Sequence, residues 1–424
     1  MKILVIGGGG REHAICQALR LDESVTALIC APGNPGIGRV AQLREVDPVD
    51  PAAVAALALA EGADLVVVGP EAPLVAGVAD AVRAAGIACF GPSGAAAELE
   101  GSKAFSKRVM AAAGVPTARS YVCVTAEEAE QALDAFGPPY VVKDDALAAG
   151  KGVVVTDDRA AALAHAVSCG QVVIEEYLDG PEVSLFAVTD GTTVLPLQPA
   201  QDFKRVGDGD AGPNTGGMGA YSPLPWAPPG LVDEVLETVL QPTVDELRRQ
   251  GRPFAGLLYA GLALTERGVR VSEFNARFGD PETEVVLPLL RTPLADLLYR
   301  AATGTLADHP PLTWSDGAAV TVVMAAQNYP QTPRKGDAIT GLDSAQASGE
   351  VTVYQAGTAL DDSGALVTSG GRVLAVTACG ADLAQARDRA YAAVAGIGFD
   401  GAHYRTDIAA AAADVGSEVH RAGG

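Results

Sequence analysis

The stretch "KILVIGGGGREHA" (residues 2–14) joins a short apolar run to a row of glycines and then to a segment that predicts a helix. The same order returns along residues 1–93, where glycine, proline or both follow each of the apolar runs at 3–6, 25–30, 65–68 and 87–90. Strands alternating with helices are typical of a doubly wound parallel sheet, whose ligands bind at the carboxyl ends of the strands. We therefore expect an α/β domain over residues 1–100, with its binding loops along one edge.

The glycine turn predicts an anion site. Backbone N–H groups and the positive end of the following helix would face a ligand there, from Gly8, Gly9, Gly10 and Arg11. A dinucleotide fingerprint would need glycine where Glu12 stands, and an acidic residue where the second strand ends in "CAP" (30–32). A phosphate-bearing substrate therefore fits better than a nicotinamide cofactor. The alternative is that these glycines serve only a tight turn.

The composition is that of a globular chain of several domains. Its 424 residues are 48% hydrophobic and 19% charged, which leaves ample apolar surface for a core. A net charge of −22 argues against a nucleic-acid partner. The scattered cysteines form no C-x-x-C pair, which indicates a reduced, cytoplasmic protein. We expect no membrane partner, because no apolar run reaches about 18 residues and the start lacks a signal peptide's h-region.

The strand and helix order changes after residue 93. Residues 101–190 predict connecting helices and a small α+β lobe, and residues 191–325 predict a larger lobe. The larger lobe contains the hairpin "GLLYAGLALTERGVRVSEFN" (256–275), whose turn is the polar "ERG". Residues 326–424 predict a β-rich domain with a helix near 381–396.

The hairpin runs into "SEFNARFGDPET" (272–283), where Glu273, Asn275 and Arg277 occupy alternate positions. If the strand persists, these three side chains share one face. A carboxylate and an amide oxygen suit Mg²⁺ or Mn²⁺, and a planar guanidinium suits phosphate or carboxylate. We expect a metal site at Glu273 and Asn275 beside Arg277. The alternative is a charged strand end that meets water.

Lysines gather in one part of the chain: Lys103, Lys107, Lys143, Lys151 and Lys204. Two of them lie in "VVKDDALAAGKGVVV" (141–155), a strand, a loop of small residues and a second strand. Such a hairpin can fold over a triphosphate, with the ammonium groups of Lys143 and Lys151 on its oxygens. It is not a Walker A loop, because it leads into a strand.

Two further segments suit ligands. In "VVIEEYLDGPEVS" (172–184) the backbone around Glu176–Leu178, beside Glu175, would hydrogen-bond to the edge of an adenine, and Glu182 would reach the ribose. The alternative is an ordinary amphipathic strand pair. The stretch "QDFKRVGDGDAGPNTGGMGAYSP" (201–223) has no apolar periodicity, so it forms either an ordered functional loop or a disordered one. Its candidate contacts to a small polar substrate are Asn214, Thr215, Gly216, Gly217, Met218 and Gly219.

Together these motifs resemble the phosphoribosylamine–glycine ligase family of the ATP-grasp superfamily. The resemblance runs in order from "KILVIGGGGREHA" through "VGPEAPLVAG", "LEGSKAFSK", "LAAGKGV", "VIEEYLDGPE", "PNTGGMGAYSP" and "EFNARFGDPET" to "GGRVLAVTA", over nearly the whole chain. It implies an ATP-grasp core of two lobes between the N-terminal domain and the β-rich C-terminal domain.

The resemblance also implies a reaction: ATP, 5-phosphoribosylamine and glycine give glycinamide ribonucleotide, ADP and phosphate through a glycyl phosphate. Glu273 and Asn275 would hold the metal, Lys103, Lys143 and Lys151 would neutralise the nucleotide, and Arg277 would follow the transferred phosphoryl group. We expect a monomer or a weak homodimer. Two alternatives remain: another ATP-grasp carboxylate–amine ligase or carboxylase, and a nucleotide-binding regulator without activity.

The chain departs from the family's pattern in three places. It has "KDDALAAGKG" (143–152) where the family is expected to have "KADGLAAGKG", so Asp144 adds a negative charge and Ala146 replaces a glycine. Phe203 stands where the family often has histidine, which argues against an essential imidazole there. The stretch "HAVSCGQVVIEEY" (165–177) is shorter than expected. These differences bear on nucleotide affinity and on motion of the small lobe.

Overall fold

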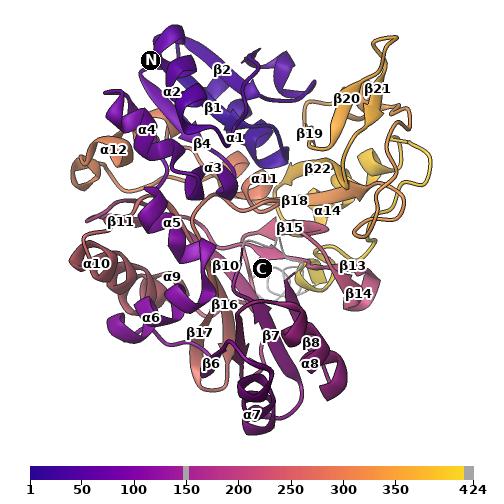
Figure 1. Ribbon diagram of the computed structural model, residues 1–424. Helices are drawn as coiled ribbons and strands as arrows, with labels where there is room; N and C mark the ends of the chain where they lie inside the picture. The colour runs from indigo at the N-terminus through magenta and orange to yellow at the C-terminus, as the bar shows by residue number, and fades with distance from the viewer. Residues whose placement is uncertain (147–151, 415–424) are drawn as a thin grey trace.

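A computed structural model describes residues 1–146 and 152–414 of the chain (Figure 1). The N-terminal sheet lies at the top of Figure 1, the small lobe at the bottom, and the C-terminal sheet at the right. The architecture is the expected one: a parallel α/β domain, a two-lobe core and a β-rich C-terminal part. Among the described helices, none has the length and apolar character needed to cross a bilayer.

The N-terminal sheet is parallel, in the order β3-β2-β1-β4-β5. Its strands are β1 (Lys2–Gly7), β2 (Ala27–Pro32), β3 (Gln42–Leu43), β4 (Leu65–Val68) and β5 (Ala88–Phe90), and its helices are α1 (Gly10–Arg20), α2 (Pro51–Glu61), α3 (Glu71–Val75) and α4 (Val78–Ala84), with the 3-10 turn η1 (Ile37–Arg39). The order reverses at β1, so the glycine turn after β1 lies at the switch point where such sheets bind ligands.

The small lobe is an antiparallel sheet in the order β6-β9-β7-β8, with a core of its own. Helices α5 (Gly94–Gly101) and α6 (Lys103–Ala113) lead into it. Its elements are β6 (Ser120–Cys123), α7 (Ala126–Phe136), β7 (Tyr140–Asp144), β8 (Val153–Thr156), α8 (Arg159–Ser168) and β9 (Val172–Glu175).

The large lobe is built on the sheet β11-β10-β16-β17. Its strands are β10 (Glu182–Asp190), β11 (Val194–Pro196), β16 (Ala255–Thr265) and β17 (Gly268–Asn275). Its helical segments are α9 (Leu231–Val235), η3 (Leu236–Leu240), α10 (Gln241–Arg249), α11 (Thr283–Val286), η4 (Leu287–Leu289), α12 (Leu294–Thr303) and η5 (Leu306–Asp308). We placed residues 182–189 in the small lobe from sequence, and that was wrong. β10 is apolar on both faces, and it is buried as a central strand against β16.

The C-terminal sheet has the order β12-β15-β18-β22-β19. Its strands are β12 (Gln201–Asp202), β15 (Gly219–Ser222), β18 (Ala318–Ala325), β19 (Val351–Gln355) and β22 (Arg372–Gly380). The helices α13 (Leu342–Ala345) and α14 (Leu383–Val394) accompany the sheet. Two short strand pairs lie beside it: β13 (Arg205–Gly207) with β14 (Ala211–Asn214), joined by η2 (Asp208–Asp210), and β20 (Thr358–Leu360) with β21 (Leu366–Thr368). Three of these sheet strands come from the 191–325 segment. β18 is buried along its whole length and takes partners on both edges, β15 and β22.

Candidate active site

A β-bulge near the end of β17 sets the geometry of the site. Gly261 lies opposite Glu273 and Leu262 lies opposite Val271, so Ser272 is the extra residue. Buried apolar side chains stand at 269 and 271 before the bulge, and at 274 and 276 after it. The alternation is therefore reset at Ser272. Glu273 and Asn275 leave the core face together, as the sequence predicts, and the strand itself ends at Asn275.

Positive charge from separate segments converges on Glu273. Burial by itself would raise the pKa of this carboxyl, but the charges of Lys204, Lys143, Lys103 and Arg277 outweigh burial and lower it. Glu273 is therefore a carboxylate at neutral pH. Within the ranges 1–146 and 152–414, no group of three or more His, Cys, Asp or Glu side chains is arranged to hold a metal ion. One carboxylate and one amide oxygen suit an ion that takes its remaining ligands from water and nucleotide phosphates.

Glu175 lies beneath the site, where it joins two lysines. Its Oε1 is 3.0 Å from Lys107 Nζ and its Oε2 is 3.0 Å from Lys143 Nζ. All three side chains are largely buried. Lys143 Nζ also donates to the Ser272 carbonyl at 2.8 Å, which ties the small lobe to the bulge of β17. Glu175, which we expected near ATP, thus orients Lys143.

Arg277 lies just beyond β17 in a network of partly buried charges. Its Nη2 donates to Asn275 Oδ1 at 3.2 Å and lies 3.1 Å from Glu100 Oε1. Its Nε donates to Glu71 Oε2 at 3.3 Å, and Nη1 donates to the Phe278 carbonyl at 3.2 Å. All three guanidinium nitrogens therefore have protein acceptors. The network joins α3, α5 and the end of β17.

The predicted adenine and ribose contacts lie along the β9–β10 connection. Glu176 pairs with Arg119 at 2.9 Å and with Arg267 at 3.0 Å. Burial would raise its pKa, but bonds from the Arg119 backbone and side chain and from Arg267 lower it to about 2. Leu178 is partly exposed, and Glu182 accepts a bond from Lys204 Nζ at 2.7 Å.

The lysines of the expected phosphate hairpin are only partly described. Lys103 Nζ donates to the Ala146 carbonyl at 3.1 Å, which brings α6 to the hairpin. Lys151 lies outside the described residues. Asp144 follows Lys143 in β7, so the two side chains point to opposite faces of the sheet. Asp144 lies beside Cys169. Burial is the main cause that raises the pKa of the Cys169 thiol, and the Asp144 carboxylate raises it further.

The glycine turn is crowded with carboxylates. The Gly9 N–H donates to Glu12 Oε2 at 2.7 Å, so this amide is already bonded. A Cβ on Gly9 would lie 3.7 Å from Asp280 Oδ2, and one on Gly10 would lie 2.6 Å from Glu284 Oε1. Gly8 packs against the Gly33 backbone, with 2.6 Å between its Cβ position and the Gly33 oxygen.

Arg11 is buried behind this turn. It donates to Glu12, and also to the Phe278 carbonyl at 3.1 Å. Its Nη1 lies 3.9 Å from Glu71 Oε2, so it joins the same network as Arg277. The turn therefore offers carboxylate acceptors, where a phosphate would need hydrogen-bond donors.

The 201–223 stretch is ordered, with short strands flanking the candidate substrate loop. Thr215 donates both its N–H (2.7 Å) and its hydroxyl (2.9 Å) to the Lys204 carbonyl, and its hydroxyl accepts from the Gly217 N–H at 3.0 Å. Gly217 has φ +111°, and a Cβ there would collide with Pro281. The loop is thus a fixed turn that only glycine permits at this position.

The other predicted loop residues lie on either side of this turn. Asn214 ends β14 and pairs with Arg205. The Gly216 N–H donates to the Tyr329 hydroxyl at 2.9 Å. Met218 is fully buried, and Gly219 begins β15. Met218 and Thr215 therefore support the loop from within, while Asn214 and Gly216 are partly exposed.

Two basic residues of the site were not among the predicted contacts. Lys204 lies between Glu182 and Glu273, whose charges outweigh the effect of burial and raise its pKa. The gathering of lysines in the sequence had indicated it. Arg372 Nη1 donates to the carbonyls of Gly216 and Asp280, and it is 2.9 Å from Asp280 Oδ1. No local signal marks Arg372, which comes from β22, far along the chain.

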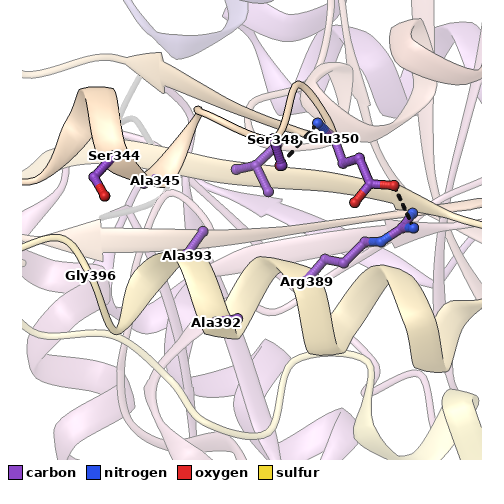
Figure 2. Close-up of a pocket in the computed structure, with 9 residues that line it drawn as sticks. Ser344, Ala345, Ser348, Glu350, Arg389, Ala392, Ala393 and Gly396 are labelled. Atoms are coloured by element: carbon purple, nitrogen blue, oxygen red, sulfur yellow. Dashed lines mark hydrogen bonds and ion pairs between the residues drawn. The ribbon is translucent and has the colours of Figure 1, made fainter.

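A shallow hollow lies elsewhere, between α13 and α14 (Figure 2). Arg389 Nη2 and Glu350 Oε1 close one end of it with an ion pair at 2.6 Å. Its lining contains none of the predicted site residues. The predicted site residues described above therefore lie around the end of β17 and not in this hollow.

Comparison with known proteins gives consistent matches over the chain. Three models of phosphoribosylglycinamide synthetase match: the N domain over residues 1–100, the ATP-grasp (A) domain over 101–283, and the C domain over 319–411. The chain is 72% identical over 415 residues to phosphoribosylamine–glycine ligase of Streptomyces coelicolor, covering 97% of this chain and 100% of that one. It is 60% identical over 417 residues to that of Leifsonia xyli subsp. xyli, covering 97% and 100%.

Solved structures agree with the sequence matches. The crystal structure of phosphoribosylamine–glycine ligase from Thermotoga maritima superposes with a TM-score of 0.83 at 34% identity, covering 96% of this chain and 100% of that one. The biotin carboxylase domain of Hydrogenobacter thermophilus 2-oxoglutarate carboxylase superposes with a TM-score of 0.72 at 19% identity, covering 95% and 91%. At that identity the second likeness shows the fold alone.

Proposed function

Because the chain belongs to the phosphoribosylglycinamide synthetase family, we propose that its reaction takes place in the cleft around the end of β17, through a glycyl phosphate. The enzyme ligates glycine to phosphoribosylamine with ATP, a step of purine biosynthesis. The observation that carries our placement is the convergence of Lys204, Lys143, Lys103 and Arg277 on Glu273.

The chemistry requires such a cluster. A carboxylate is a poor electrophile, so a glycine oxygen first attacks the γ-phosphorus of ATP and ADP leaves. The amine of phosphoribosylamine then attacks the acyl carbon, phosphate leaves and the amine gives up a proton. The first step depends on alignment and charge neutralisation, which lysines and a divalent ion supply. The small lobe, closed on the cleft, keeps water from the acyl phosphate.

ATP-grasp enzymes use ATP and a divalent metal ion. In our proposal Glu273 and Asn275 would hold Mg²⁺ or Mn²⁺, which would neutralise the charge of the phosphates. Lys143, held by Glu175 and the Ser272 carbonyl, keeps a donor for the phosphates, beside Lys103 and Lys151. The nucleotide base lies along Glu176–Leu178, and Glu182 binds the ribose.

We assign Arg277 a different part from the one that the sequence suggests. Its donors already bind Asn275, Glu71, Glu100 and the Phe278 carbonyl. It therefore holds the Asn275 amide in place for the metal and adds positive charge to the cleft, without following the phosphoryl group.

Phosphoribosylamine lies across the cleft from ATP, between the turn at Gly8–Arg11 and the loop 214–217. The carboxylates at the turn suit its amine and hydroxyls, and Arg372 supplies a cation for its phosphate. This placement revises the expectation that the turn itself binds the phosphate. The Gly9 amide is bonded to Glu12, and further acids surround it.

The decisive assay is glycine-dependent ADP release, with phosphoribosylamine generated in situ. Release that needs both glycine and phosphoribosylamine supports the proposal. Release driven by bicarbonate or by another amine would favour another ATP-grasp ligase or carboxylase, and ATP binding without release would favour a regulator. The six cysteines are free, consistent with a cytoplasmic enzyme, which we propose to be a monomer or weak homodimer.

A further inference from the structure

The hairpin β13–β14 is fastened to a distant segment, residues 403–407. The Thr406 N–H and hydroxyl donate to the two oxygens of Asp208 at 2.7 Å and 2.5 Å. His403 Nε2 hydrogen-bonds to the Val206 carbonyl at 2.7 Å. These contacts join parts of the chain nearly 200 residues apart, and in Figure 1 the hairpin lies beside the yellow end of the chain.

Arg405 is the centre of this attachment. It is 1% exposed. Its Nε and Nη2 grip both oxygens of Asp407 at 2.7 Å and 2.6 Å, and Nη1 donates to Asp210 Oδ1 at 2.7 Å and to the Arg205 carbonyl at 3.1 Å. Its guanidinium carbon lies 4.8 Å from the centre of the Phe203 ring. A planar guanidinium is the side chain that meets all of these partners at once.

The contacts of Arg405 fall on both neighbours of Lys204 in the chain. The Phe203 ring is held on one side and the Arg205 carbonyl on the other. Between them the Lys204 ammonium donates to Glu182 at 2.7 Å, and its charge lowers the pKa of Glu273. The Lys204 carbonyl also accepts the two bonds from Thr215 that shape the substrate loop.

We propose that Arg405 is a positioning residue for the ligase reaction, which acts by fixing the position of the Lys204 ammonium. The inference rests on the proposed function, since it takes Lys204 to face the nucleotide phosphates. The C-terminal part of the chain thereby takes part in catalysis from outside the cleft.

Helix α14 makes the attachment rigid. The Tyr391 hydroxyl donates to the Arg405 carbonyl at 2.8 Å and accepts from the Ile408 N–H at 3.1 Å. Arg387 donates to the carbonyls of Thr406 and Ile408 at 2.7 Å and 3.0 Å. The backbone that presents Arg405 is therefore fixed on both sides of this residue.

The test is a double-mutant cycle between Arg405→Lys and Lys204→Met. A lysine at 405 keeps the charge but cannot hold Asp407 with two nitrogens and also reach Asp210. We expect Arg405→Lys to lower kcat by about 10- to 100-fold, as a small misplacement near reacting groups does. In the Lys204→Met background the same change should lower kcat by less than about twofold, since effects that pass through one residue do not multiply.

Arg334→Lys is the matched control, because Arg334 also binds two carboxylates, of Asp337 and Asp400, yet contacts no residue of the hairpin. It should leave kcat and KM unchanged. Amide hydrogen exchange should accelerate over 205–214 in Arg405→Lys and not in Arg334→Lys.

Losses that multiply in the double mutant would overturn the inference while leaving the proposed function standing. A fully active Lys204→Met enzyme would remove Lys204 from the proposed function, and the inference with it. If Arg405→Lys does not fold, Asp210→Gly removes one partner of Arg405 on the surface, at a φ of +54° that glycine accepts. It should lower kcat in the parent and not in the Lys204→Met background, and an equal loss in both would also refute the proposal.

Discussion

Protonation of His13 should weaken the folded enzyme as the pH falls. His13 lies on α1, 6% exposed, and its Nδ1 accepts the Gln355 N–H of β19 at 2.8 Å, with the Tyr354 ring 5.5 Å away. Burial, aided by the charge of Arg39, lowers the pKa of the imidazole to about 4. A proton on Nδ1 would also break this hydrogen bond, because His13 Nδ1–H and the Gln355 N–H would then both be donors. The contact between the N-terminal domain and the C-terminal sheet therefore needs a neutral ring.

The size of the effect follows from linkage. The unfolded chain binds the proton near pH 6.5 and the folded chain near pH 4, so stability is complete above 6.5 and is lost as the pH falls between these values. At about 1.4 kcal/mol per pKa unit, the full loss is about 3 kcal/mol, and about 2 kcal/mol is gone by pH 5. His13→Asn keeps an acceptor for the Gln355 N–H but does not titrate.

Urea unfolding of both proteins at pH 7 and pH 5 measures the difference. The parent should lose about 2 kcal/mol more free energy of unfolding than His13→Asn between these pH values. Histidine NMR gives the pKa directly, and the signal missing from His13→Asn identifies the residue. A His13 signal that titrates near pH 6.5, or an equal loss of stability in the two proteins, would refute the reasoning.

Glu273→Gln should abolish ligation at limiting metal while the circular dichroism spectrum stays that of the parent; normal turnover would dismiss the metal site. Arg277→Lys should lower kcat by about 10-fold or more, because one lysine nitrogen cannot stand in for both Nε, which binds Glu71, and Nη2, which binds Asn275 and Glu100. Raised metal concentration should restore part of that rate if Arg277 acts through Asn275, and no restoration would count against this role. Gly9→Asp should raise KM for phosphoribosylamine strongly and leave KM for ATP nearly unchanged, because the new carboxylate enters the substrate side of the cleft; a collapse of ATP binding would place the nucleotide at the first domain instead.

The parts of the site that depend on local order follow from sequence. The strand, glycine turn and helix at residues 2–14, and the shared face of Glu273 and Asn275, are examples, because alternation and turn chemistry act over a few residues. The partners of Arg277 do not follow in this way. Glu71 and Glu100 meet it only because the N-terminal domain and α5 pack against the end of β17. Arg372 and Arg405 were missed for the same reason.

Strand pairing shows the same limit. The run at 182–189 is a strand in any interpretation, but its sheet is decided by a partner some 70 residues later. An apolar run that can be buried on both faces does not indicate which core will receive it. The 201–223 stretch offers the opposite lesson, since glycine, aspartate and asparagine suit both a disordered segment and a tightly bonded one. Contacts from residues 403–407 decide between them.

The bulge at Ser272 makes chain length, more than side-chain identity, the quantity that evolution must preserve at this point. The Ser272 carbonyl that receives Lys143 belongs to the main chain, so many residues at 272 would still present it. Loss of one residue there would instead remove the bulge, and with it the extra main-chain carbonyl that accepts from Lys143 Nζ. If the strand kept its length but paired without the bulge, Glu273 and Asn275 would turn inward and Phe274 outward. Relatives that use this strand should therefore vary freely at position 272 and almost never differ by a one-residue insertion or deletion between 262 and 275.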